Sequence, residues 1–241
     1  MPNICVVLPT LNEAENLPRM LEAIRALGAD LQVLVVDDLS QDGTGQVAEG
    51  LAQLLGGIAV VHRTGRPGYG QALTEGFRWA LDRGAQVLLT LDCDFSHDPA
   101  DIPRLLAALE HADLVVGSRY TTGGAIRDWP RYRRLLSAAA NGFVRTLFRL
   151  PSRDCTSGFR AYRRQVLEGI PWDRLHSPGY SFLVEVLYWA SRGGGRRVAE
   201  VPICFTDRKW GKSKMGPREI VFGAANLLKL RLQLLLQRAR Y

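Results

Sequence analysis

The chain has 241 residues, of which 46% are hydrophobic and 23% are charged, and its formal net charge is +7. This length supports one sizeable core, or one α/β domain with an appendage. The positive charge predicts an acidic partner, but no helix-turn-helix, RNP or zinc pattern accompanies the arginines. We therefore expect nucleotide phosphates or anionic lipid headgroups as partners, and no nucleic acid.

Apolar, β-rich segments alternate with helical patterns along the first half of the chain. Strands are expected at residues 4–8, 32–36, 58–61, 86–91 and 114–116. Helices are expected at residues 16–27, 44–55, 70–83 and 101–110, the second of them with Thr44 as its N-cap. This alternation predicts an α/β fold with a mostly parallel central sheet.

Segments that contain polar residues follow four of these strands. They are residues 9–13 after the first strand, Asp37-Asp38 after the second, His62-Arg63 after the third and Asp92-Cys93-Asp94 after the fourth. Ligands of such sheets bind outside the carboxyl ends of the strands. Two carboxylates one residue apart, such as Asp92 and Asp94, can hold a divalent cation against a diphosphate.

The pair Asp37-Asp38 leads through a turn-rich segment into the second helix. An acid here can hydrogen-bond a base edge or the ribose hydroxyls of a nucleotide. The other interpretation is a helix-capping turn in which Asp42 and Thr44 satisfy backbone N–H groups. Nucleotide binding by the acidic pair and capping by Asp42 and Thr44 can occur together, because they involve different residues. The glycine-rich residues 65–70 follow the third strand and not the first, which disfavours dinucleotide binding.

Four widely spaced cysteines form neither a CxxC pair nor a His/Cys metal pattern, which indicates a reduced, cytosolic protein. The chain begins without a signal-peptide pattern, and we expect it in the cytoplasm. Its most apolar stretch, residues 220–236, is interrupted by Asn226, Lys229, Arg231 and Gln233. We therefore expect no transmembrane span.

Motifs along nearly the whole chain carry a resemblance to a known family. They are Val6-Val7-Leu8-Pro9-Thr10-Leu11-Asn12-Glu13, Val35-Val36-Asp37-Asp38 with Ser40 and Asp42-Gly43-Thr44, Arg63 with Gly68-Tyr69-Gly70, Asp92-Cys93-Asp94-Phe95-Ser96-His97-Asp98-Pro99, Val116-Gly117-Ser118-Arg119-Tyr120, Asp154-Cys155-Thr156-Ser157-Gly158-Phe159-Arg160, Gly179-Tyr180-Ser181-Phe182 with Glu185, and Arg208 with Gly211-Lys212-Ser213-Lys214-Met215. In this order they resemble a family 2 glycosyltransferase with the GT-A fold, a Rossmann-like fold of nucleotide-diphospho-sugar transferases. Within the family, the chain most resembles the polyprenol (dolichol) phosphate mannose synthases.

The resemblance implies a donor site at the strand ends. The donor-nucleotide site maps onto Pro9, Leu11, Glu13, Val36, Asp38, Asp92, Cys93 and Asp94. A divalent cation, Mg²⁺ or Mn²⁺, maps onto Asp92, Asp94 and Ser96, with water as the alternative third ligand at the position of Ser96.

The resemblance also implies a cationic acceptor site. Its phosphate-binding residues map onto Arg119, Arg133, Arg134, Arg208 and Lys214. Catalytic roles fall to Asp94, Arg119 and Arg208. Asp154 is a candidate for orienting the sugar or an acceptor-contacting arginine or, alternatively, for capping the turn before Gly158. Two polyanions must meet here, and a cation with several guanidinium groups offsets their repulsion.

The implied activity is inverting transfer of mannose from GDP-mannose to a polyprenyl (dolichyl) monophosphate. A phosphate monoester is already largely ionised at neutral pH, so it can attack the anomeric carbon without a strong general base. The alternatives are the same chemistry with another nucleotide sugar such as UDP-glucose or with a saccharide acceptor, and a catalytically silent sugar-nucleotide-binding protein. The presence of Asp92 and Asp94 argues against the last.

Two parts of the chain are expected: a GT-A catalytic domain at residues 1–216 and a leucine-rich C-terminal helix at residues 217–241. Because the acceptor lipid cannot leave the bilayer, we expect peripheral association with the cytoplasmic face of a membrane, with this helix at the membrane interface. A membrane-anchoring partner subunit and packing of the helix on the domain are the alternatives.

Overall fold

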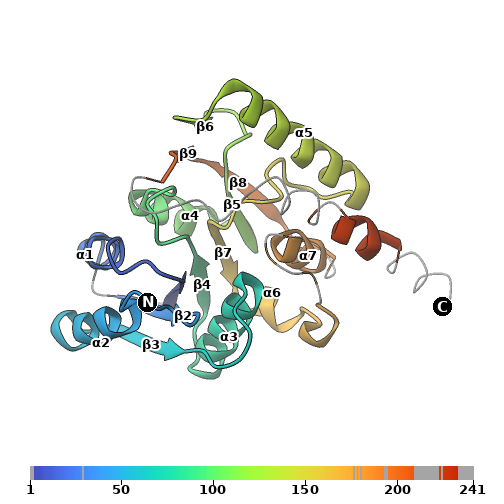
Figure 1. Ribbon diagram of the computed structural model, residues 1–241. Helices are drawn as coiled ribbons and strands as arrows, with labels where there is room; N and C mark the ends of the chain where they lie inside the picture. The colour runs from blue at the N-terminus through green and yellow to red at the C-terminus, as the bar shows by residue number, and fades with distance from the viewer. Residues whose placement is uncertain are drawn as a thin grey trace.

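The computed structural model describes residues 3–28, 30–175, 177, 179, 181–192, 195–208, 223 and 225–232 (Figure 1). Its strands are β1 (Ile4–Thr10), β2 (Leu31–Asp37), β3 (Ile58–His62), β4 (Val87–Thr90), β5 (Leu114–Ser118), β6 (Ala125–Ile126), β7 (Arg160–Arg163), β8 (Val198–Pro202) and β9 (Cys204–Phe205). Its helices are α1 (Leu17–Ala26), α2 (Thr44–Leu55), α3 (Tyr69–Asp82), α4 (Ile102–Ala108), α5 (Arg131–Phe148), α6 (Arg164–Glu168) and α7 (Ser181–Ala190), with short 3₁₀ helices η1 (Pro99–Asp101) and η2 (Trp172–Arg174).

The central sheet has the strand order β3-β2-β1-β4-β7-β5-β8. Every neighbouring pair is parallel except those of β7, which runs antiparallel to β4 and to β5. Parallel strands β1, β2 and β4 therefore bring their carboxyl ends to one edge. The predicted α/β fold with a mostly parallel sheet is confirmed.

Helices cover both faces of this sheet, and alternate side chains of each strand point to opposite faces. On one face, Val6 and Leu8 of β1 belong to a buried cluster that includes apolar residues of α1, α2 and α4. On the other, Cys5 and Val7 belong to a second cluster with residues of α3, α5, α6 and α7. Both layers are visible around the sheet in Figure 1.

The predicted strands and helices agree with the structure to within one or two residues at their ends. The prediction of Thr44 as an N-cap is wrong. Gly43, with a φ of 89°, is the N-cap of α2, and Thr44 is the first helical residue. The Thr44 hydroxyl instead accepts a hydrogen bond from the Glu13 amide at 2.8 Å, because the loops after β1 and β2 lie against each other.

Strand β7 lies in the middle of the sheet, yet the sequence did not predict it. Its segment begins and ends with arginine, unlike the apolar runs that identified the other central strands. The Arg160 side chain is fully buried and donates to the backbone carbonyls of Ser157, Leu183 and Cys155. These bonds explain how a charged residue starts a central strand.

The described part of the C-terminal segment is helical at residues 223 and 225–232. Leu227 and Leu230 are buried and belong to the same core cluster as α7, while Leu228 and Leu232 are exposed. The Ser181 hydroxyl donates to the Gly223 carbonyl at 3.3 Å. These residues therefore pack on the domain. Among the described residues, no helix is long and apolar enough to cross a membrane.

Candidate functional site

A pocket opens at the carboxyl ends of β1, β2 and β4. Its lining residues are Pro9, Thr10, Leu11, Glu13, Asp38, Tyr69, Ala72, Asp92, Asp94 and Arg208. Most of the predicted donor residues are therefore brought together. Val36 and Cys93 do not line the pocket, because their side chains are buried in the two core clusters, on opposite faces of the sheet.

The loop after β1 is held by the loop after β2. The Asn12 amide donates to the Ser40 hydroxyl and the Gln41 amide donates to the Asn12 side chain, both at 2.8 Å. The Ala14 amide donates to Asp42 at 3.1 Å. Asn12 has a φ of 56°, a left-handed conformation that asparagine tolerates better than most residues. These bonds fix the position of Glu13 at the pocket wall. Asp42 also accepts a hydrogen bond from the Thr44 amide at 3.0 Å, as predicted for the turn before α2.

Asp38 is anchored on both carboxylate oxygens. Arg63, which is 8% exposed, donates to Asp38 Oδ1, and the Gly68 amide donates to Asp38 Oδ2 at 2.6 Å. Arg63 also donates to Glu75 of α3 at 3.1 Å. No function was assigned to Arg63 from the sequence, although its position at the end of β3 was the available signal. Arg63 connects Asp38 to α3.

Asp92 and Asp94 are the acidic centre of the pocket. Tyr69 Oη donates to Asp92 Oδ1 at 3.0 Å. Asp94 Oδ1 accepts from the Ser96 amide at 3.0 Å and from the Ser96 hydroxyl at 2.5 Å. The second oxygen of Asp94, Oδ2, lies 2.9 Å from Arg208 Nη2. Burial, reinforced by the charge of Asp94, raises the pKa of Asp92 to about 7.

This pair fits a divalent cation. Two hard carboxylates lie one residue apart, and burial together with the charge of Asp94 raises the pKa of Asp92, so a bound cation would favour its ionised form. Within the described ranges, no group of three or more His, Cys, Asp or Glu residues is arranged to hold a metal ion. Asp92 and Asp94 would therefore supply two protein ligands, leaving the remaining positions to diphosphate and water. The Ser96 hydroxyl, predicted as a ligand, donates a hydrogen bond to Asp94.

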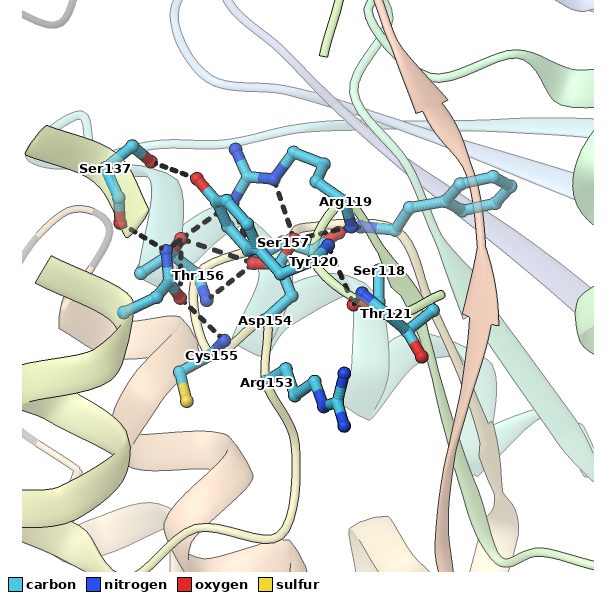
Figure 2. Close-up of polar contacts among 12 residues, drawn as sticks. Ser118, Arg119, Tyr120, Thr121, Ser137, Arg153, Asp154, Cys155, Thr156 and Ser157 are labelled. Atoms are coloured by element: carbon cyan, nitrogen blue, oxygen red, sulfur yellow. Dashed lines mark hydrogen bonds and ion pairs between the residues drawn. The ribbon is translucent and has the colours of Figure 1, made fainter. Parts of the chain in front are cut away.

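Arg119 and Asp154 do not line this pocket, and they form a buried, bidentate ion pair with each other (Figure 2). Arg119 Nε and Nη2 donate to the two oxygens of Asp154, each at 2.7 Å, and the Arg119 amide adds a third bond at 3.0 Å. Burial opposes a charge on Asp154, but the guanidinium of Arg119 holds the pKa of that carboxyl below its usual range. Asp154 thus orients Arg119.

The other predicted acceptor residues differ in position. Arg208 lies in the pocket, 4.0 Å from Glu13 as well as close to Asp94. Arg133 pairs with Asp207 at 3.1 Å and stacks on Trp129, while Arg134 is exposed on α5. Lys214 lies outside the described residues.

Two further side chains adjoin the acidic pair, and the sequence assigned neither a function. Tyr69 opens α3 and reaches Asp92. His97 is 2% exposed, packs beside the rings of Phe159 and Phe205, and lies 3.8 Å from Asp92. Burial lowers the pKa of His97 to about 4. Both residues belong to segments that carried the family resemblance, which was the signal available.

The chain is similar to known proteins over most of its length. The model of the family described as Glycosyl transferase family 2 matches residues 5–170. The chain is 43% identical over 212 residues to an undecaprenyl-phosphate mannosyltransferase of Micrococcus luteus, covering 88% of this chain and 87% of that protein. It is 44% identical over 225 residues to a polyprenol monophosphomannose synthase of Mycolicibacterium smegmatis, covering 91% and 84%.

Solved structures share its fold. A glucosyl-3-phosphoglycerate synthase from Mycobacterium tuberculosis, in complex with Mn²⁺, uridine diphosphate and phosphoglyceric acid, has a TM-score of 0.69 at 23% identity, over 95% of this chain and 78% of that one. A mannosyl-3-phosphoglycerate synthase from Rubrobacter xylanophilus has a TM-score of 0.68 at 20% identity, over 100% and 76%.

Proposed function

We propose that the chain, which belongs to glycosyl transferase family 2, transfers mannose, with inversion, from GDP-mannose to a polyprenyl (dolichyl) monophosphate. It is a glycosyltransferase with the GT-A fold. The observation that carries the proposed substrates is the 43–44% identity, over about nine tenths of the chain, to two enzymes named for mannosyl transfer to polyprenyl phosphates.

The pocket suits a sugar diphosphate donor. Asp38 is oriented by Arg63 and the Gly68 amide, as a carboxylate that recognises a base or ribose hydroxyl must be. Asp92 and Asp94 would hold a divalent cation, Mg²⁺ or Mn²⁺, which stabilises the charge of a departing nucleoside diphosphate when bound. Glu13 completes the acidic wall and lies near Arg208.

Arginines balance the charge of the acceptor. Arg208 reaches the acidic pair, and the ion pair with Asp154 orients Arg119. With Arg133, Arg134 and Lys214 these residues supply the positive charge that a phosphate nucleophile needs beside a diphosphate. Because that phosphate is largely ionised at neutral pH, no strong base is required for its attack on the sugar.

The proposed acceptor places the enzyme at a membrane. A polyprenyl chain remains in the bilayer, so its phosphate is reached only at the lipid–water interface. We therefore assign the protein to peripheral association with the cytoplasmic face. Association through a membrane-anchoring subunit is the competing arrangement.

The decisive experiment is a donor panel. Purified protein, polyprenyl phosphate in detergent and Mg²⁺ or Mn²⁺ are incubated with radiolabelled GDP-mannose, UDP-glucose and other sugar nucleotides, and the organic phase is extracted. We expect a labelled, mild-acid-labile lipid from GDP-mannose, none with Asp94→Ala, and full yield with the exposed-site control Leu54→Ala. Label from UDP-glucose alone, or label only in a water-soluble saccharide, would refute the proposed substrates.

A further inference from the structure

Helix α5 (Arg131–Phe148) exposes an unusual amount of apolar surface. Its exposed large hydrophobic residues are Tyr132 at 71%, Leu135 at 72%, Leu136 at 51% and Phe143 at 49%. Their spacing of three, four and seven residues puts them on one face of the helix. A contiguous exposed apolar face of this kind marks an interaction surface.

The exposed apolar face is not the face that holds α5 to the domain. Asn141, Val144 and Phe148 are the buried residues of the helix, and they occupy the side opposite to Tyr132 and Phe143. Figure 1 shows α5 along the outside of the molecule. The apolar face therefore makes no contribution to the packing of α5 on the domain.

A third sector of α5 is cationic. Arg131, Arg134 and Arg145 are exposed, and their spacing places them along one flank of the apolar face. Arg149, which is also exposed, is the C-cap residue directly after the helix. The helix contains no Asp or Glu. An apolar face bordered by arginines complements the acyl-chain boundary and the phosphate headgroups of an anionic lipid surface.

We propose that the exposed face of α5 docks on the interface of an anionic bilayer, with Tyr132, Leu135, Leu136 and Phe143 among the acyl chains and the flanking arginines on lipid phosphates. This inference rests on the proposed function for its choice of partner, because a lipid acceptor requires the enzyme at a membrane. Leu54 on α2 is 81% exposed, lies outside α5 and provides a control.

Polar contacts join α5 to the candidate site. Tyr120 follows Arg119 in the chain, and its Oη donates to the hydroxyl of Ser137 on α5 at 2.7 Å (Figure 2). Asn141 of α5 makes two further bonds: its Oδ1 accepts from the Cys155 amide at 2.8 Å, and its Nδ2 donates to Thr156 Oγ1 at 3.2 Å. The same Thr156 hydroxyl accepts from Arg119 Nη2 at 2.8 Å.

A second connection reaches Arg208. Arg133 of α5 pairs with Asp207, the residue before Arg208. A bilayer bound to α5 would therefore lie in fixed geometry to the arginines assigned to the acceptor phosphate.

The test is co-sedimentation with vesicles of phosphatidylcholine and phosphatidylglycerol, without substrate. The double variant Leu135→Glu/Leu136→Glu should reduce the partition coefficient by at least about tenfold, since two leucines leave the interface. The matched variant Leu54→Glu should bind as the wild type does. Arg145→Gln/Arg149→Gln should weaken binding by about fivefold per arginine, and by less in vesicles of phosphatidylcholine alone.

Hydrogen exchange of the wild type needs no substitution and covers the case in which the double variant misfolds. Vesicles should slow exchange in peptides of residues 131–149. Protection confined to other peptides, or undiminished vesicle binding by a folded Leu135→Glu/Leu136→Glu, would overturn the proposal. So would a dimer in light scattering that this variant dissociates while vesicle binding persists, because the face would then cover a second copy.

A short, water-soluble polyprenyl phosphate separates this inference from the proposed function. If both hold, the double variant keeps wild-type turnover with this acceptor and loses it with long polyprenyl phosphate in vesicles. If the wild type shows no transfer to either acceptor but its α5-dependent vesicle binding remains, the proposed function fails and the docking surface stands.

Discussion

Each carboxylate of the acidic pair has one oxygen that accepts a hydrogen bond from a nearby hydroxyl group. Tyr69 holds Asp92 Oδ1, and Ser96 holds Asp94 Oδ1. Arg208 partly neutralises the pair through Asp94 Oδ2. The arrangement orients the ligands before a cation arrives, but it also places two like charges together in a poorly solvated site. The site should therefore destabilise the metal-free fold.

Replacing Asp92 tests this destabilisation. The pKa of Asp92 rises from its ordinary 3.8 to about 7 on folding. Between these values the folded protein holds a proton that the unfolded chain has released, so the free energy of unfolding falls as the pH rises through that window. In EDTA at about pH 8, Asp92→Asn should raise the free energy of unfolding by at most about 4 kcal/mol. At about pH 4 the gain should vanish.

Urea denaturation at both pH values measures this, and Asp42→Asn is a control of opposite sign. Burial acts to raise the pKa of Asp42, but hydrogen bonds from Thr44 and Ala14 outweigh it and lower that pKa. Its ionised form therefore stabilises the fold above the ordinary pKa, and Asp42→Asn should lose stability at the higher pH. A loss of stability in Asp92→Asn at that pH would contradict the expected strain.

The Tyr69 hydroxyl should matter for metal affinity. Removing a group that orients a metal ligand commonly weakens binding by about tenfold or more. We expect Tyr69→Phe to lower Mn²⁺ affinity by about tenfold, measured by calorimetry or by paramagnetic resonance with GDP present. Tyr132→Phe, exposed on α5, should bind Mn²⁺ as the wild type does. Unchanged affinity in Tyr69→Phe would show that the hydroxyl does not orient Asp92.

Contacts between elements set the shape of the site. The chain before β7 passes close to the start of α3 and the end of β4. The Thr90 hydroxyl of β4 donates to the Gly158 carbonyl at 2.6 Å. A methyl group at Gly158 would lie 2.6 Å from Tyr69 Oη and 3.4 Å from Asp92 Oδ1. Glycine is required here for the close approach of two elements that lie far apart in sequence.

A double-mutant cycle tests this approach. Gly158→Ala should displace the Tyr69 hydroxyl and weaken Mn²⁺ binding by a factor similar to that of Tyr69→Phe. In a Tyr69→Phe background the same substitution should do less, because the nearest atom is gone. Gly142→Ala, where a methyl group meets nothing within 4 Å, is the control and should leave Mn²⁺ affinity unchanged. Additive losses would show that Gly158 acts independently of Tyr69.

At the scale of the whole molecule, the candidate site lies at the carboxyl edge of one sheet, and helices cover both faces of that sheet. The described residues of the C-terminal segment add to one of these layers through Leu227 and Leu230. The predicted boundary at residue 216 would make residues 217–241 a separate element. Buried leucines shared with the core instead predict that this segment contributes to the stability of the domain.

Paired substitutions measure this contribution. Leu227→Ala/Leu230→Ala should lower the free energy of unfolding by about 2 kcal/mol or more, because buried leucines leave cavities when truncated. Leu228→Ala/Leu232→Ala changes the same chemistry at positions that are 51% and 59% exposed, and it should change stability little. Equal stability of both variants in urea denaturation would instead make the C-terminal helix an independent element.

The sequence alone was sufficient for the alternating elements of residues 4–116 and for their strand ends, because apolar runs and helical periodicity are local signals. It also identified Asp38, Asp92 and Asp94 as site residues, since adjacent parallel strands end at a common edge. Pro9, Leu11 and Glu13 came from the family resemblance, and all six line the pocket. The roles of the individual residues remain predictions.

The tertiary structure decided what depends on contacts between distant segments. The antiparallel β7, with its buried Arg160, has no local apolar signature. Tyr69 reaches Asp92 across 23 residues of sequence, and Arg119 meets Asp154 across 35. The pattern of α5 shows that it is amphipathic, but only packing shows which side is left exposed. Local periodicity determines which elements form, whereas long-range packing determines which side chains meet.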